Sequence, residues 1–219
     1  MSRASDHAYA VIRAMILSGE LPSGAQLSEE ALALRCAVSR TPVRDALRRL
    51  EADLLIRRSE SQRSFVSDWS DADIEDAFDL RSMLEAQAAR RAATRLSSAQ
   101  VEALRQHSRA IAVAIEEAKP NVTAFLEHNR AFHETIIAGA GSPRLASLLT
   151  GLVEQPVIWR TAQNYGLENL RRSHREHEEL LAAFDCRDGS WAASIMAAHI
   201  RRAYHAFLDA YASQRPTVD

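Results

Sequence analysis

Apolar residues recur every three or four positions along most of the chain, as they do on the buried face of an α-helix. In the first third, the stripe of Tyr9, Ile12 and Ile16 predicts one helix, and the following LPSGAQL is expected to form a turn. Ser28 is placed to cap a second helix, and Pro42 fits the first turn of a third. The segment LLIRRSESQRSFVSDW then alternates, which predicts two short strands around a polar turn. The expected order is three helices followed by a β-hairpin.

From about residue 70 onward the pattern is helical. Glycine, proline and asparagine divide this part into six amphipathic segments, expected at Asp71–Arg95, Ser98–Ala118, Val122–Ala138, Pro143–Thr161, Leu167–Asp185 and Ser190–Ala212. Amphipathic helices joined by short loops form a bundle. The sequence therefore predicts a mostly α protein with a small N-terminal domain over residues 1–69, an all-α bundle over residues 70–213 and a tail over residues 214–219.

The third predicted helix has two unlike faces. Its apolar side consists of Val43, Leu47, Leu50 and Leu54. Its other side carries Arg40, Arg44 and Arg48, spaced so that they form one charged ridge. Taken alone, such a ridge is most often a solvated face. Placed after two helices and before a hairpin, it has the position of the recognition helix of a winged helix-turn-helix module, which enters the major groove of DNA.

The distribution of charge supports a DNA partner, although the formal net charge of −2 does not. Between Arg40 and Arg63, seven arginines stand against four acidic residues. Local basicity matters more than the total for binding phosphates, and the arginine fork can bind phosphates or guanine edges through two parallel hydrogen bonds. Double-stranded DNA is therefore the expected macromolecular partner.

The cysteine count and the hydropathy predict a cytoplasmic protein without membrane contact. Cys36 and Cys186 are the two cysteines, too few for a disulfide framework or a cysteine zinc motif, which fits a reducing interior. The N-terminus lacks the apolar core and cleavage site of a signal peptide. No stretch approaches the roughly 20 consecutive apolar residues that cross a bilayer.

The stretch from Ile16 to Trp69 resembles the N-terminal domain of the GntR family of bacterial transcription regulators. The residues that match are the opening ILSGELPSGAQLSEEALA, the segment VSRTPVRDALRRLE and a hairpin ending in SFV. The resemblance implies DNA contacts from Ser39, Arg40, Thr41, Arg44 and Arg63. The family often has Leu-Gly before VSR, Glu-Gly before the first strand and a glycine at the tip of the hairpin. This chain has Cys36-Ala37, Ala52-Asp53 and Gln62-Arg63-Ser64 at those places.

Three histidines fall where apolar residues belong. His133, His177 and His199 lie on the inward stripes of three different predicted helices. A buried imidazole without a partner costs on the order of 1–3 kcal/mol, so each needs one. Separate hydrogen-bonded core histidines are the ordinary explanation, but three on facing helices fit a converging metal site better. The other histidines are interpreted as surface or locally hydrogen-bonded residues, with His174 sharing the face of His177; they are His7, His107, His128, His174 and His205.

The second half resembles the FCD domain that follows the DNA module in the FadR subgroup of GntR proteins. The matching segments are LRSMLEAQAARRAA, EHNRAFHETI, REHEELLAAF and AAHI, within Asp73 to Tyr211. The resemblance implies an effector-binding and dimerisation domain with a divalent transition metal, zinc or nickel, at Asn129, His133, His177 and His199. Asn129 stands where the family usually has aspartate. A neutral amide is a poorer ligand, so we expect lower metal affinity and a site one charge more positive, which favours a carboxylate effector as an additional ligand.

Arg81 is a further polar residue on an inward stripe. Its neighbours on that stripe are Ile74, Phe78, Glu85 and Ala88. It either forms an ion pair with Glu85 one turn on, or clamps the carboxylate of an effector near the metal, which the resemblance favours. Gln155, Trp159 and Tyr165 are candidates to line the same cavity.

The sequence thus predicts a ligand-responsive bacterial transcription regulator rather than an enzyme. We expect a homodimer on a palindromic operator, because one recognition helix reads few base pairs, and a repressor released by a small carboxylate metabolite. Two alternatives stay open at this point. The bundle could serve dimerisation only, or the metal site could hydrolyse a substrate with Glu134 or Glu178 as base.

Overall fold

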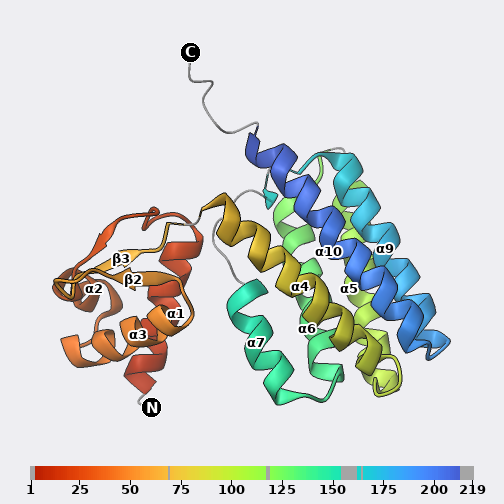
Figure 1. The fold of residues 1–219 in the computed structure, drawn as a ribbon, viewed down its shortest axis with the longest axis horizontal. Helices are drawn as coiled ribbons and strands as arrows, with labels where there is room; N and C mark the ends of the chain where they lie inside the picture. Colours follow the sequence, from red (N-terminus) through yellow and green to blue (C-terminus); the bar gives the residue numbers. More distant parts are fainter. Residues whose placement is uncertain (1–2, 69, 117–118, 154–161, 164, 213–219) are drawn as a thin grey trace. The chain divides into compact units, whose positions relative to one another are not determined.

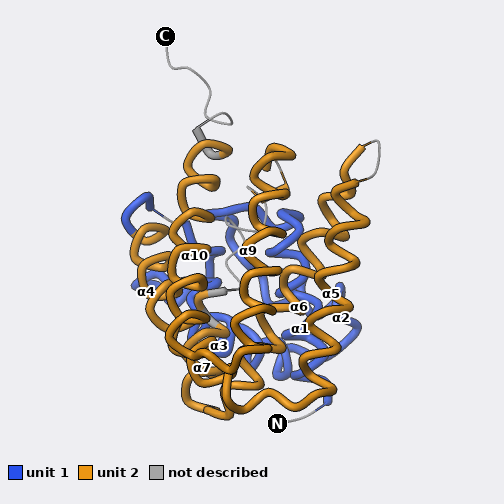
Figure 2. The backbone as a smooth tube through the Cα atoms, turned by 90° about the vertical axis from the view of Figure 1, so that its right-hand side faces the viewer, with its two compact units in different colours: residues 1–72, 154–160 blue, residues 73–153, 161–219 orange. Residues whose placement is uncertain are grey.

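The computed structural model describes residues 3–68, 70–116, 119–153, 162–163 and 165–212. The described residues divide into two compact units, one that runs up to Ala72 and one that starts at Asp73 (Figures 1 and 2). Within the described residues, no helix is long and apolar enough to cross a membrane.

The N-terminal unit has the predicted order of three helices and a hairpin. Its elements are α1 (Arg3–Leu17), β1 (Gln26–Leu27), α2 (Glu29–Cys36), α3 (Arg40–Ala52), β2 (Ile56–Arg58) and β3 (Ser64–Val66). The sheet has the order β1-β3-β2, and both pairings are antiparallel. Strand β1 lies inside the segment that we expected to be only a turn. Two residues are too few to show the alternation of a strand, so the pairing with β3 is what defines it.

The core of this unit is formed by the apolar faces of the helices, and the capping residue acts as expected. Ile12, Val43 and Leu50 are fully buried, and the Ser28 hydroxyl accepts a hydrogen bond from the Ala31 amide at 3.4 Å. Leu54 does not belong to the buried face, contrary to the expectation from spacing. Helix α3 ends at Ala52, Leu54 has a φ of 59°, and its side chain is 62% exposed.

The C-terminal unit is an all-α bundle. Its helices are α4 (Asp71–Ala92), α5 (Ser98–Glu116), α6 (Val122–Gly139), α7 (Pro143–Val153), α9 (Leu167–Asp185) and α10 (Gly189–Ala212). The predicted segments therefore form helices; the last part of the fourth segment, residues 154–161, lies outside the described residues. Helix α5 packs against α6 and α9, and α10 lies between α4 and α9 (Figure 1). Phe78, Phe132 and Phe207 fill the interior.

Candidate DNA-reading surface and metal centre

The residues that we expected to contact DNA are all exposed. Ser39 is the N-cap of α3, and Arg40, Thr41 and Arg44 follow in its first turns. Arg63 lies in the β2–β3 turn, where its carbonyl accepts a hydrogen bond from the Ser59 amide at 2.9 Å. The first four therefore share one helix end and the fifth lies on the hairpin. Their DNA contacts remain a prediction.

Glu29 holds two of these arginines, a role that the helical spacing did not reveal. One carboxylate oxygen accepts hydrogen bonds from Arg44 Nε at 2.7 Å and from an Arg40 terminal nitrogen at 3.1 Å. Partial burial alone would raise the pKa of the Glu29 carboxyl, but the bonds and charges of Arg40 and Arg44 outweigh it and lower that pKa. The available sequence signal was the position of Glu29 directly after the capping Ser28, at the start of a helix beside α3.

The three inward histidines meet in the bundle core. His133 lies on α6, His177 on α9 and His199 on α10, and each is at most 3% exposed. One ring nitrogen from each lies within 4.8 Å of the other two. The Nε2 atoms of His133 and His199 are 3.2 Å apart. This separation is close to the about 3.3 Å expected for two nitrogens bound to a tetrahedral zinc ion at 2.0–2.1 Å.

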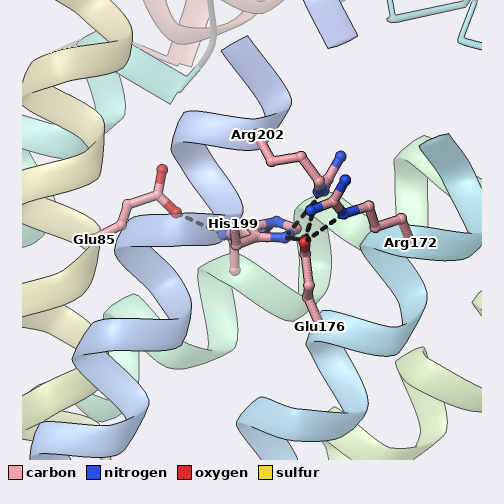
Figure 3. Close-up of polar contacts among 6 residues, drawn as sticks. Glu85, Arg172, Glu176, His199 and Arg202 are labelled. Atoms are coloured by element: carbon pink, nitrogen blue, oxygen red, sulfur yellow. Dashed lines mark hydrogen bonds and ion pairs between the residues drawn. The ribbon is translucent and has the colours of Figure 1, made fainter. Parts of the chain in front are cut away.

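Two carboxylates, the buried Glu85 and the half-buried Glu176, orient two of these rings. Glu85 on α4 pairs with His133 Nδ1 at 2.5 Å, and Glu176 on α9 pairs with His199 Nδ1 at 2.7 Å (Figure 3). A carboxylate on one ring nitrogen fixes the tautomer and leaves the other nitrogen to bind a metal. Both Nε2 atoms are therefore directed to the space shared by the histidines.

Each carboxylate is in turn held by an arginine. Arg81 Nε donates to Glu85 at 2.9 Å. Arg202 Nε donates to both oxygens of Glu176 at 2.7 and 2.8 Å (Figure 3). Burial alone would raise the pKa of each glutamate. Arg81 and His133 instead lower the pKa of Glu85 to about 2, and His199 and Arg202 lower that of Glu176 to about 2. Both carboxylates are thus ionised at neutral pH.

His177 has no such support. Among the described residues, neither of its ring nitrogens has a hydrogen-bond partner, and its ring stacks on Phe132 with centroids 4.3 Å apart. Burial, followed by the charges of the neighbouring histidines, lowers the pKa of His177 well below its usual value, and burial lowers that of His199 to about 4. Neutral imidazole is the form that binds metals. A buried, unpartnered and neutral imidazole beside two oriented ones fits a metal centre.

The remaining predicted site residues have mixed positions. Asn129 is half-buried one turn before His133, and its role as a ligand stays a prediction. Arg81 forms the ion pair with Glu85, and its role toward an effector also stays a prediction. The half-buried Tyr165 donates to the Ala203 carbonyl at 3.4 Å, and burial raises its pKa to about 12 against the opposing charges of Arg81 and Arg202. Gln155 and Trp159 lie outside the described residues.

The sequence did not point to Glu176 or Arg202. For Glu85 it indicated the ion pair with Arg81 but not the bond to His133. Glu176 directly precedes His177, so it lies off the inward stripe of α9. Arg202 follows His199 by three residues, which places it on the same side of α10. That spacing was the one signal in the sequence for its position.

Each of the two units matches a known protein family. Residues 76–202 match the FCD domain, and residues 4–66 match the family described as bacterial regulatory proteins, gntR family. The HTH-type transcriptional repressor RspR of Escherichia coli (strain K12) is 26% identical over 206 residues, covering 88% of this chain and 84% of RspR. An HTH-type transcriptional regulator from the TAR-I ttuE-ttuC' intergenic region of Agrobacterium vitis is 32% identical over 136 residues, covering 61% of this chain and 78% of that protein.

Solved structures show the same fold. E. coli McbR/YncC superposes with a TM-score of 0.81 at 21% identity, over 96% of this chain and 100% of that one. A GntR regulator from Rhodococcus sp. RHA1 gives a TM-score of 0.72 at 22% identity, over 96% and 100%. Together with the two domain matches, of which the FCD domain alone spans more than half of the sequence, they lead to one conclusion: the chain belongs to the GntR family of DNA-binding transcription regulators and carries an FCD domain.

Proposed function

We propose that the protein is a metal-containing repressor that leaves its operator when a small carboxylate binds in the FCD domain. One observation carries the proposal: His133, His177 and His199 converge from three helices, and the two that are oriented by carboxylates face the unpartnered third. A purely structural core has no need of such an arrangement, because an unsatisfied buried imidazole destabilises it by about 1–3 kcal/mol. Two curated relatives, RspR and GlaR of E. coli, are named transcriptional repressors, which supports the sign of regulation.

The proposed metal ligands are His133, His177 and His199, with Asn129 binding directly or through water. Imidazole donors suit zinc or nickel. When bound, the cation offers a positively charged docking point for a carboxylate oxygen. Glu85 and Glu176 keep the rings of His133 and His199 in place while the effector enters and leaves.

The charges around the site favour an anionic effector. The ion pairs Arg81–Glu85 and Arg202–Glu176 are each neutral, and imidazole and amide ligands add no charge when they bind a metal. A divalent cation would therefore leave an excess of about +2 in a buried site. The bond from Arg81 to Glu85 uses Nε, so it does not consume the two terminal nitrogens, which we assign to the effector carboxylate.

In the proposed mechanism the protein is a homodimer, and Ser39, Arg40, Thr41, Arg44 and Arg63 of each chain read one half of a palindromic operator. The effector shifts an equilibrium between dimer geometries that match or mismatch the two half-sites. Helix α4 carries Arg81 and Glu85 and begins shortly after β3 of the DNA-binding unit, so it is the proposed route between effector and reader.

Two measurements test the proposal. Elemental analysis of tag-free protein supplied with divalent metals should find one tightly bound ion, which is lost when His133 is replaced by alanine. A thermal-shift screen of organic acids should then find acids that stabilise the metal-loaded protein and weaken its binding to operator DNA in a gel shift.

The alternatives give different results. A bundle that serves dimerisation alone would bind no metal and would show no selective stabilisation by acids. Turnover of a stabilising compound would point to an enzyme. Unchanged DNA affinity of a folded Arg44→Ala variant would remove the assignment of the reading surface.

A further inference from the structure

A second pair of histidines joins helices α5 and α6. His107 lies on α5 and His128 on α6, both are half-buried, and their Nδ1 atoms are 3.2 Å apart. The ring centroids are 5.5 Å apart and the rings are tilted by 40°. Without a metal, one ring donates its Nδ1 proton to the other, so the two rings hold opposite tautomers.

The same geometry suits a metal ion. Two nitrogens bound at 2.0–2.1 Å to a tetrahedral ion lie about 3.3 Å apart. The Nδ1 separation of 3.2 Å equals the separation of the His133 and His199 Nε2 atoms in the proposed metal centre. Burial and the charge of His128 lower the pKa of His107, which favours the neutral form that coordinates metals.

The pair lies away from the three-histidine centre. His128 and His133 are five residues apart on α6, which turns them by about 140° around the helix and separates them by about 7.5 Å along it. His133 faces the buried space shared with α9 and α10, while His128 faces α5 and is half-buried. One ion therefore cannot use both sets of ligands.

We infer that His107 and His128 form a second, weaker binding site for a divalent transition metal, bridging α5 and α6. Copper, nickel and zinc are the ions that imidazole pairs favour. Because both side chains are half-buried, we expect water to fill the remaining coordination positions. The ion links α5 to α6 through its two histidine ligands, so its binding stabilises the bundle independently of an effector.

Metal stoichiometry of the full-length, tag-free chain tests the inference. After removal of bound metal with a chelator, equilibrium dialysis against zinc chloride should give two ions per chain for the wild type. His107→Gln and His128→Gln should each retain only the tighter ion, and His177→Leu only the weaker one. His205→Gln, an exposed histidine on α10, is the matched control and should retain both.

A second measurement uses the unmodified protein, so that it does not depend on the folding of a variant. Protein labelled with ¹⁵N-histidine should be titrated with zinc beyond the first equivalent. The Nδ1 resonances of His107 and His128 should then move to the chemical shifts of metal-bound nitrogen, whereas their Nε2 resonances should keep the chemical shifts of nitrogen that binds no metal. A single ion per chain in the wild type, two ions in His107→Gln, or unshifted Nδ1 resonances would each overturn the second site.

Discussion

His177 shows how one side chain can oppose stability in one state and support it in another. It is fully buried, stacks on Phe132, and has no hydrogen-bond partner for either nitrogen among the described residues. Leaving a buried polar group unpaired costs about 1–3 kcal/mol. A metal ion that binds only the folded state at 100 times its dissociation constant returns about 2.7 kcal/mol. We therefore expect the contribution of His177 to the free energy of unfolding to be unfavourable without metal and favourable with metal.

Replacement of His177 by leucine, a side chain of similar volume, should reverse the effect of metal on stability. The metal-free variant should be more stable than the metal-free wild type by on the order of 1 kcal/mol, because the unpaired nitrogens are gone. Zinc should raise the unfolding midpoint of the wild type well above that of the variant. Urea unfolding with and without a chelator measures both quantities. His174→Leu, one turn earlier and half-buried, should keep the full zinc effect.

We expect Glu29 to influence DNA binding through the two arginines to which it is hydrogen-bonded. Its carboxylate fixes the Arg40 and Arg44 side chains by hydrogen bonds of 3.1 and 2.7 Å. A guanidinium group that is already held in place loses less conformational entropy when it binds a base edge than a freely moving one. The negative charge of Glu29 itself opposes phosphate binding. We therefore expect Glu29 to favour specific over non-specific DNA binding.

Glu29→Gln should accordingly lower the ratio of operator affinity to affinity for scrambled DNA by about tenfold, within the 1–3 kcal/mol typical of one bidentate contact. Gel shifts on both DNAs at one salt concentration give the ratio. Glu30→Gln is the matched control, because it removes the same charge from the next, exposed position, whereas both arginines bond to Glu29. Equal ratios in the two variants would show that charge alone is responsible.

At the scale of elements, three non-glycine residues in the connections of the DNA-binding unit have a left-handed backbone conformation. Ala37 follows α2 with a φ of 52°, Leu54 follows α3 with 59°, and Gln62 lies in the β2–β3 turn with 62°. The sequence comparison pointed to missing glycines near these places, although the second one falls one residue after the expected Ala52-Asp53. An L-residue in this conformation costs about 1–2 kcal/mol.

Leu54→Gly should therefore stabilise the protein by up to about 1 kcal/mol, since the strain is removed and the leucine side chain is 62% exposed. The same change at Leu34 is the control. Leu34 is 80% exposed but lies within α2, so glycine there should destabilise by about 1 kcal/mol. Urea unfolding of both variants measures the two signs, and destabilisation by Leu54→Gly would contradict the strain.

The elements themselves were largely predictable because helix formation follows local spacing. The long helices begin and end within a few residues of the glycine, proline and asparagine signals, apart from the fourth, whose end is not described. The short strand β1 and the exposed Leu54 were not foreseen. Local spacing could not reveal either of them. Strand β1 depends on its pairing with β3, which is distant in sequence, and Leu54 is exposed because α3 ends two residues before the end of its apolar stripe.

At the scale of the whole molecule, we expect the regulator to act as a dimer. A single recognition helix reads too few base pairs to select one operator among many genomic sites. Two chains of 24.3 kDa should therefore bind one palindromic operator.

Analytical ultracentrifugation of the complex should give the mass of two chains plus one DNA duplex. Binding to a duplex with a single half-site should be at least about a hundredfold weaker at the same salt concentration, because half of the base and phosphate contacts are lost. Equal affinity for full and half operators would contradict a dimeric reader.

The sequence by itself determined the fold class, the arginine-bearing face of the third helix and the inward position of three histidines, because an α-helix places every residue on a face by its local repeat. Only the tertiary structure decided which faces meet. The bonds from Glu29 to the arginines, from Glu85 to His133, from Glu176 to His199 and between His107 and His128 each join two different helices. Helical spacing fixes the direction of a side chain about its own axis, whereas the neighbour it finds depends on how the helices are packed and rotated against one another.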